Sequence, residues 1–169
     1  MKKKILVFSF LLFIAWWGIA FSDTCYKVKG TVKTINALDE ITQQGCITLQ
    51  LFDQNGNKAF KESGYLFGRV IDSSTPGVTY LTHTATFKDG SMFESFEDVA
   101  VIVNPENIEC GEDGLPCYCE VHELITNIVK GKGFFTNVSS AAVEANGHIN
   151  TCEGDNENKF ELTGEICFE

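Results

Sequence analysis

The sequence predicts an all-β protein that folds as a single antiparallel β-barrel of eight strands. Its segments are rich in β-branched and aromatic residues, and turn-forming pairs such as Asp89-Gly90 separate them. The last segment alternates apolar with polar or small side chains, so one face of that strand is apolar. About eight such segments in one chain are typical of a closed barrel or a two-sheet sandwich. We predict the barrel, with its inner face including Phe160, Leu162, Ile166 and Phe168.

The strands are expected in chain order wherever β-favouring residues run between turn signals. The turn signals are clusters of Gly, Pro, Asn and Asp at residues 53–57, 73–77, 89–90, 111–116, 131–133 and 153–158. They delimit strands at 26–35, 46–52, 65–71, 78–88, 92–103, 118–129, 143–151 and 159–168. Only residues 37–44 and 137–145 have room for a helical turn, and neither shows an apolar stripe of helical period.

The first 22 residues have the layout of a secretory signal peptide. Three lysines come first, a mostly apolar run follows, and Ala20 and Ser22 then occupy the −3 and −1 positions of a small-residue cleavage site. A short transmembrane anchor is the alternative. A lipid anchor on Cys25 is disfavoured by the polar residues before it. We therefore expect a signal peptide at 1–22, a β-barrel domain at 23–169, and a secreted or periplasmic protein.

The chain is acidic, with a formal net charge of −10, which becomes −13 when the three leader lysines are removed. Such a charge is repelled by nucleic acids and by anionic membrane surfaces, so neither is an expected partner. The strand alternation also fits an outer-membrane barrel. Seven cysteines and a chain that ends in Glu169 argue against that reading. We expect no stable membrane insertion once the leader is cleaved.

The seven cysteines predict disulfide bonds, and their odd number leaves at least one thiol unpaired within the chain. In a closed antiparallel barrel the first and last strands meet. Because Cys25 begins the first and Cys167 ends the last, we expect a Cys25–Cys167 disulfide. A bond from Cys152 to Cys167 is excluded, since the two lie too far apart along paired strands.

Three of the remaining cysteines, Cys110, Cys117 and Cys119, lie around a glycine-rich loop, "CGEDGLPCYCEVH". We expect a local disulfide that closes this loop, from Cys110 to either Cys117 or Cys119. A metal site from Cys117, Cys119 and His122 is the alternative. Zinc sites ordinarily use tighter paired spacings, so no metal site is expected.

Four stretches together resemble the allene oxide cyclase barrel-like superfamily: "GCITLQLFD", "LTHTATFKDGSMFESFEDVAVI", "ITNIVKGKGFFTNVSSAAVEANGHINTC" and "KFELTGEICF". That group includes plant allene oxide cyclases, dirigent proteins and many uncharacterised secreted bacterial proteins. The best landmarks are a "TF-x-DG" hairpin and the spacing of Gly131, Gly133 and Phe135. The resemblance implies an eight-stranded antiparallel barrel with an internal cavity and no cofactor. Fold similarity alone carries no activity.

The glycines of "GKGFF" predict a structural turn. Gly131 and Gly133 permit positive φ or close approach of the backbone. A phosphate-binding loop would need a following helix in a parallel sheet, which the surrounding pattern lacks.

His83 is the leading candidate for a functional residue, because this ionisable ring shares a strand face with apolar neighbours. Its opposite neighbour depends on the length of the Asp89-Gly90 loop. With a two-residue loop, His83 faces Phe96, and the carboxylates of Glu94 and Asp98 share its face.

A three-residue loop with a bulge at Gly90 changes these neighbours. His83 then faces Ser95, and Phe93 and Glu97 lie on its face. We favour this register because it also directs three valines inward, Val99, Val101 and Val103.

These residues leave three functions open. The first is a disulfide-supported barrel that binds a small apolar molecule, with expected ligand contacts at His83, Phe87, Phe93 and Phe96. The second is a cofactor-free cyclase, isomerase or dirigent-type enzyme, in which His83 acts with Glu97 or Glu94 as acid and base. The third is a surface-structural or adhesion module. The sequence leaves the question of catalysis and the oligomeric state open.

Overall fold

The computed structural model describes residues 23–39, 41–110, 116–152 and 156–169. The signal peptide expected at 1–22 lies outside these residues. Ten strands and two short 3-10 helices follow one another along the chain. Their bounds are β1 Thr24–Asn36, β2 Thr42–Phe52, β3 Lys58–Asp72, β4 Val78–Phe87, β5 Met92–Ile102, η1 Pro105–Asn107, β6 Glu109–Cys110, β7 Pro116–Ile125, β8 Ile128–Lys132, η2 Gly133–Phe135, β9 Val138–Asn150 and β10 Asn158–Phe168.

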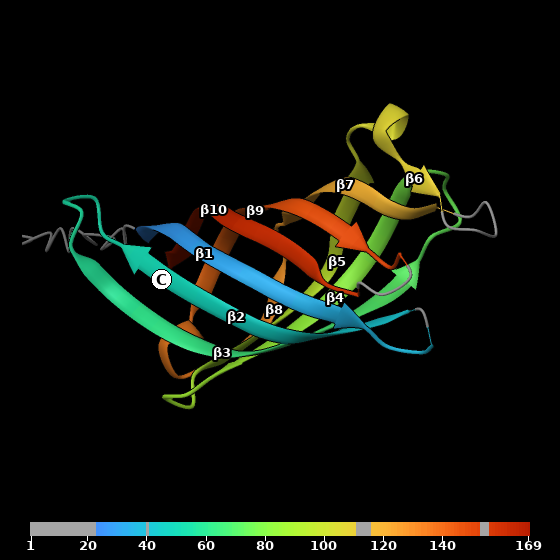
Figure 1. The fold of residues 1–169 in the computed structure, drawn as a ribbon. Helices are drawn as coiled ribbons and strands as arrows, with labels where there is room; N and C mark the ends of the chain where they lie inside the picture. The colour runs from blue at the N-terminus through green and yellow to red at the C-terminus, as the bar shows by residue number, and fades with distance from the viewer. Residues whose placement is uncertain (1–22, 40, 111–115, 153–155) are drawn as a thin grey trace, which may run out of the picture.

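The sheet closes on itself into an antiparallel barrel, as predicted (Figure 1). Eight strands make the wall, in the order β7-β9-β10-β1-β2-β3-β4-β5, and β5 pairs with β7 to complete the circuit. The short strands β6 and β8 extend this sheet at β7 and β5. Within the described part of the chain, no helix has the length and apolarity needed to cross a bilayer.

Strand β5 has two partners on one edge, which the sequence did not predict. Its first half pairs with β8 and its second half pairs with β7. The single strand expected at 118–129 is therefore broken after Ile125, and the chain resumes as β8 at Ile128. The segment 137–145, in which a helical turn was possible, belongs to β9 from Val138 onward instead. Such a turn is absent because Val143 and Ala145 alternate into the barrel core with period two.

The predicted glycine turn is present, although Gly131 itself still belongs to β8. Gly133 has a φ of +65° and begins η2. A Cβ on Gly131 would overlap the carbonyl of Phe135, so only glycine fits there. The turn thereby directs Phe135 into the barrel, where its side chain is buried.

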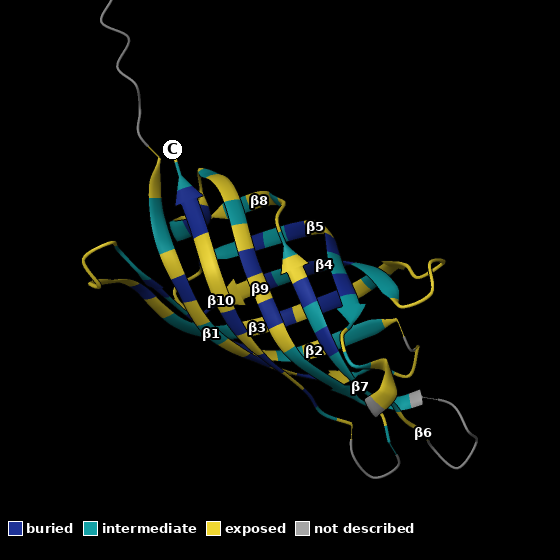
Figure 2. Cartoon of the chain, turned by 90° about the horizontal axis from the view of Figure 1, so that it is seen from above, coloured by how far each residue is buried: buried dark blue, intermediate teal, exposed yellow. Residues whose placement is uncertain are grey.

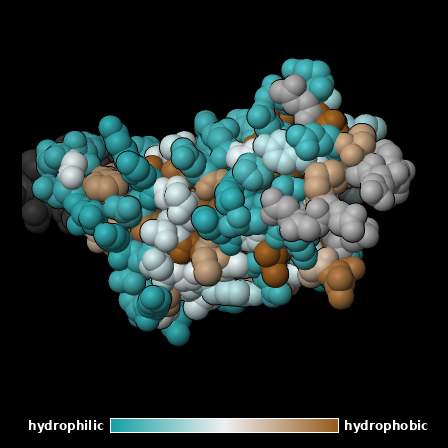
Figure 3. Space-filling model, viewed as in Figure 1, coloured by the Kyte–Doolittle hydropathy of each residue, from teal (hydrophilic) through white to brown (hydrophobic). Residues whose placement is uncertain are grey.

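Alternation along the strands fills the barrel interior with apolar side chains. Buried and exposed residues alternate along β9 and β10 in Figure 2. Phe160, Leu162 and Ile166 are buried as predicted, while Phe168 is half-buried against the core. Figure 3 shows that one outer face is mostly hydrophilic, with scattered apolar side chains.

An aromatic cluster occupies one part of the interior. The Phe135 ring lies 5.2 Å from the ring centroids of Phe60 and Phe93 and 5.5 Å from that of Phe87. Edge-to-face and stacked contacts of this kind add to the burial of apolar area. Phe87, expected to contact a ligand, is thus part of a packed core.

The disulfide between Cys25 and Cys167 is present and joins the first and last strands of the barrel. The two cysteines are direct partners in the β1–β10 ladder. The pairing follows from closure, because closure places the start of β1 beside the end of β10.

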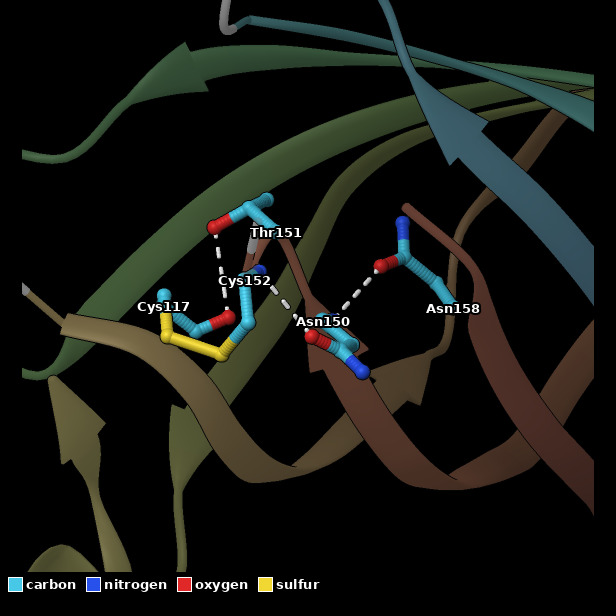
Figure 4. Close-up of a disulfide and its surroundings, with 5 residues drawn as sticks. All are labelled: Cys117, Asn150, Thr151, Cys152 and Asn158. Atoms are coloured by element: carbon cyan, nitrogen blue, oxygen red, sulfur yellow. Dashed lines mark hydrogen bonds between the residues drawn. A yellow bond between two sulfur atoms is a disulfide. The ribbon is translucent and has the colours of Figure 1, made fainter. Parts of the chain in front are cut away.

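The second disulfide joins Cys117 to Cys152, so the expected bond from Cys110 to Cys117 or Cys119 is wrong (Figure 4). Strands β7 and β9 are neighbours, and the backbone N–H of Thr151 donates to the Cys117 carbonyl, which brings Cys152 alongside. Cys119 instead packs against the core, and Cys110 is exposed. Two disulfides indicate an oxidising compartment.

Candidate functional site

His83 lies on the inner face of β4, as the sequence predicted. It pairs with Gly68 on β3 and with Ser95 on β5. This is the register expected for the three-residue loop. The ring is 7% exposed, so it belongs to the barrel interior and not to the outer surface.

A bulge in β5 decides which acid lies beside His83. Thr82 pairs with Phe96 and Leu81 pairs with Asp98, so Glu97 has no partner in the ladder. Glu97 has a φ of +60°. The extra residue changes which side chains point inward, because inward and outward positions alternate along a strand.

The prediction that Glu97 or Glu94 lies beside His83 is therefore wrong. Glu97 is exposed, and Glu94 forms an ion pair with Lys130 at 2.8 Å on the outer face. Phe96, an expected ligand contact, is 42% exposed. Beyond the bulge, Asp98 and Ala100 are buried in place of the three valines expected to point inward, Val99, Val101 and Val103.

Three neighbouring strands bring His83, Asp98 and Glu123 together, and we call these three residues the His–acid cluster. His83 Nδ1 lies 2.8 Å from Asp98 Oδ2 and 3.3 Å from Glu123 Oε1. The Ser95 hydroxyl donates to Asp98 Oδ2 and accepts the backbone N–H of His83 at 3.2 Å. Strands β4, β5 and β7, which are neighbours in the barrel wall, thus each contribute one residue of the cluster.

Burial dominates the electrostatics of the cluster. Asp98 is 0% exposed and Glu123 is 7% exposed. Burial alone would lower the pKa of His83, but the charges of Glu123 and Asp98 and the hydrogen bond with Asp98 outweigh it, so the pKa is raised. Burial raises the pKa of Glu123, although the nearby His83 opposes the shift.

Two carboxylate oxygens in the cluster accept no hydrogen bond from the described residues. They are Asp98 Oδ1 and Glu123 Oε1, and both are buried. A buried polar atom without a hydrogen-bond partner costs free energy. A bound group that contacts these oxygens would therefore gain binding free energy.

A small cavity adjoins the cluster. Its volume is about 40 Å³, which is room for roughly three water molecules. His83, Glu123 and Gln43 supply its polar lining, and Phe93 lines it as expected. The rest of the wall is apolar and comes mainly from β1, β2, β9 and β10, with residues such as Val32, Ile47, Leu49, Val143, Ala145, Phe160, Leu162 and Ile166.

Sequence reasoning missed Glu123 and named Asp98 only in the register that was not favoured. A signal for Glu123 was available, since it alternates with Val121 and Ile125 and so shares their inward face. Cys117 is in a disulfide, which rules out the alternative metal site that needed its thiolate with Cys119 and His122.

Gly68 makes room for the imidazole. A Cβ at this position would lie 2.8 Å from His83 Cδ2 and 2.9 Å from Nε2. Replacing Gly68 with alanine is therefore expected to displace the ring and to lower the free energy of unfolding by about 1–3 kcal/mol, as overpacking does. Urea denaturation measures this loss. In a protein that already carries His83→Ala, the same substitution should change the free energy of unfolding little. An equal loss of stability there would contradict the proposed clash between the new Cβ and the His83 ring.

Comparisons of the chain with models of protein families, with curated proteins and with solved structures found no match. Fold and site define a class: a closed eight-stranded antiparallel barrel with a small apolar cavity and a buried His–acid cluster in its wall. The resemblance to the allene oxide cyclase barrel-like superfamily rests on sequence landmarks and stays a prediction.

Proposed function

We propose that this barrel is a secreted or periplasmic binding protein for a small, mostly apolar molecule that carries one polar group. The proposal rests on the composition of the cavity lining. Its side chains are apolar except for those of His83, Glu123 and Gln43. Ligand sites typically combine an apolar wall with a few polar groups that fix orientation.

The polar corner favours a ligand with a hydrogen-bond acceptor. The His83 imidazole can donate a hydrogen bond, its pKa is raised by the neighbouring acids, and it lies 3.3 Å from Glu123 Oε1, which lines the same cavity. A carbonyl, hydroxyl or carboxylate group would therefore bind at this corner, with the hydrocarbon part against Leu49 and Leu162.

Cavity size restricts the ligand. Sites for drug-sized ligands are about 300–1,000 Å³, whereas this cavity is about 40 Å³. The proposed ligand has few heavy atoms, or else it displaces lining side chains as it enters.

Thermal unfolding of the purified protein tests the proposal with carboxylic acids, alcohols and alkanes of matched and increasing chain length. A ligand present at about 100 times its Kd stabilises the fold by about 2.7 kcal/mol and raises Tm by about 5–10 °C. Short acids and alcohols should raise Tm more than the matching alkanes. No shift with any of the compounds would count against the proposal.

Two alanines on β9 give a matched pair of variants that locates the binding. Ala145 is buried and lines the cavity beside Glu123, whereas Ala142 is exposed on the outer face. Ala145→Leu should fill the cavity and abolish the Tm shift, and Ala142→Leu should retain it. Equal binding by both variants would place the ligand elsewhere.

A second candidate is a cofactor-free isomerase or cyclase. The observation that favours it is an acid, Glu123, and an imidazole, His83, that both face the same cavity at 3.3 Å from one another. Such a pair suits proton transfer to and from a bound carbonyl compound. Proton NMR spectroscopy of each bound compound before and after incubation tests this, with Glu123→Gln expected to abolish turnover and Glu94→Gln to preserve it.

A further inference from the structure

The His–acid cluster has the composition of a metal-ion ligand set. One imidazole nitrogen and two carboxylates, all buried, each offer a ligand atom within 4.8 Å of the others. We propose that His83, Asp98 and Glu123 bind one divalent transition-metal ion, of the kind represented by Zn²⁺ and Mn²⁺. Binding of this ion does not depend on the proposed apolar ligand.

The distances within the cluster are close to those that a bound ion requires. Nitrogen and oxygen ligands lie about 2.0–2.2 Å from such ions, which places neighbouring ligand atoms about 2.8–3.6 Å apart in octahedral or tetrahedral geometry. His83 Nδ1 lies 2.8 Å from Asp98 Oδ2 and 3.3 Å from Glu123 Oε1. Both distances fall within that range, and the three ligand atoms all lie within 4.8 Å of one another.

The second observation that supports a metal ion is that the two buried carboxylates have too little positive charge around them. Among the described residues the buried oxygen Asp98 Oδ1 has no hydrogen-bond donor, and Glu123 Oε1 has no hydrogen bond either, with only the His83 ring 3.3 Å away as an ion-pair partner. No lysine or arginine lines the cavity in that part of the chain. Two buried carboxylates beside a single imidazole need further positive charge or protons. A divalent cation would supply that charge and bind these two oxygens.

Surrounding groups already orient the ligands. The Ser95 hydroxyl donates to Asp98, and Gly68 leaves room for the His83 ring in its observed position. Partners of this kind fix metal-binding side chains and strengthen metal affinity. The mixture of one imidazole with two carboxylates suits Mn²⁺, Fe²⁺ or Zn²⁺, and for Mn²⁺ it is a better ligand set than thiolates would be.

The open side of the site faces the cavity. Three protein ligands leave at least one coordination position, as in catalytic metal centres and unlike closed structural ones. Because His83 and Glu123 line the cavity, that position is directed toward the apolar space. Among the described residues, the other group with metal-binding atoms is Cys25, Glu165 and Cys167, in which the two sulfurs form a disulfide.

Calorimetric titration of chelator-treated protein with ZnCl₂ and MnCl₂ tests the proposal, after the free thiols have been alkylated. We expect one ion per chain. CoCl₂ should give visible absorption bands of nitrogen and oxygen ligation without thiolate charge transfer. Asp98→Asn and Glu123→Gln should each weaken binding by at least about 100-fold, and Ser95→Ala by about 10-fold.

Two control variants lie nearby but face outward. Glu97 is the neighbour of Asp98 and is exposed, and His122 is the neighbour of Glu123 and lies 3.8 Å from Glu144 outside the barrel. Glu97→Gln and His122→Gln should bind metal as the unaltered protein does. Absence of both heat and cobalt bands in the folded unaltered protein would overturn the proposal. Undiminished binding by the conservative Glu123→Gln variant would also overturn it. The apolar compounds are tested on the same metal-free protein, so the two proposals fail independently.

Discussion

Replacing Asp98 with alanine is expected to lower the free energy of unfolding by about 3–5 kcal/mol, because it leaves a buried charge without its partner. Asp98 is 0% exposed, and its Oδ2 interacts with both the Ser95 hydroxyl and His83 Nδ1. Without this carboxylate, His83 retains only Glu123 to compensate its charge. Urea denaturation of the metal-free protein measures the loss.

The neighbouring residue supplies the control for this prediction. Glu97→Ala removes an exposed carboxylate from the same strand and should change stability by less than about 0.5 kcal/mol. A loss of similar size in both variants would mean that the bulge geometry, and not the buried interaction, is responsible.

Replacing all three residues of the His–acid cluster should lower the free energy of unfolding less than removing one of them. Exchanging a buried ionic group for apolar residues of similar volume is often neutral or stabilising. The triple variant His83→Leu, Asp98→Val and Glu123→Leu is therefore expected to regain most of the stability lost in Asp98→Ala. If it does, the cluster is not needed for folding. A triple variant as unstable as Asp98→Ala would instead indicate a structural role.

The second large effect on stability is expected when the disulfide between Cys25 and Cys167 is removed. The bond closes a loop of 142 residues, and restriction of the unfolded chain by such a loop is worth about 5 kcal/mol in the chain-entropy model. Serine replacement of both cysteines should therefore lower the free energy of unfolding by about this amount. It should also raise the m-value in urea, because the unfolded chain becomes more expanded.

The second disulfide provides a comparison within the same molecule. Cys117 and Cys152 are separated by 35 residues, for which the same model gives about 4 kcal/mol. The double serine variant of this pair should be the less destabilised of the two. The opposite order would show that local strand packing, and not loop closure, determines the contribution of each disulfide.

The fold was predictable because it depends on local alternation. The alternation of Phe160, Leu162 and Ile166 predicts the inner face of that strand without knowledge of which strands pair with it. The Cys25–Cys167 bond then follows from closure alone. The partner of Cys117 was not predictable in this way, because it depends on β7 and β9 being neighbours, which no local pattern encodes.

The candidate site was predictable only in part. The inward position of His83 and its pairing with Ser95 follow from the turn at Gly90. The identity of the acids does not, because a bulge at Glu97 is not evident from residue types. Glu123 comes from a strand distant in sequence, and only the completed barrel brings it to His83.

The unpaired residue in β5 has a consequence for how the protein can evolve. Substitutions at Glu97 leave the spacing of the strand unchanged, and loss of Glu97 would leave Asp98 directly after Phe96, paired with Leu81 and still pointing inward. The presence of Glu97 is therefore not needed to direct the acid toward His83. Insertion of a single residue between Ser95 and Phe96 would instead change which side chain faces the histidine.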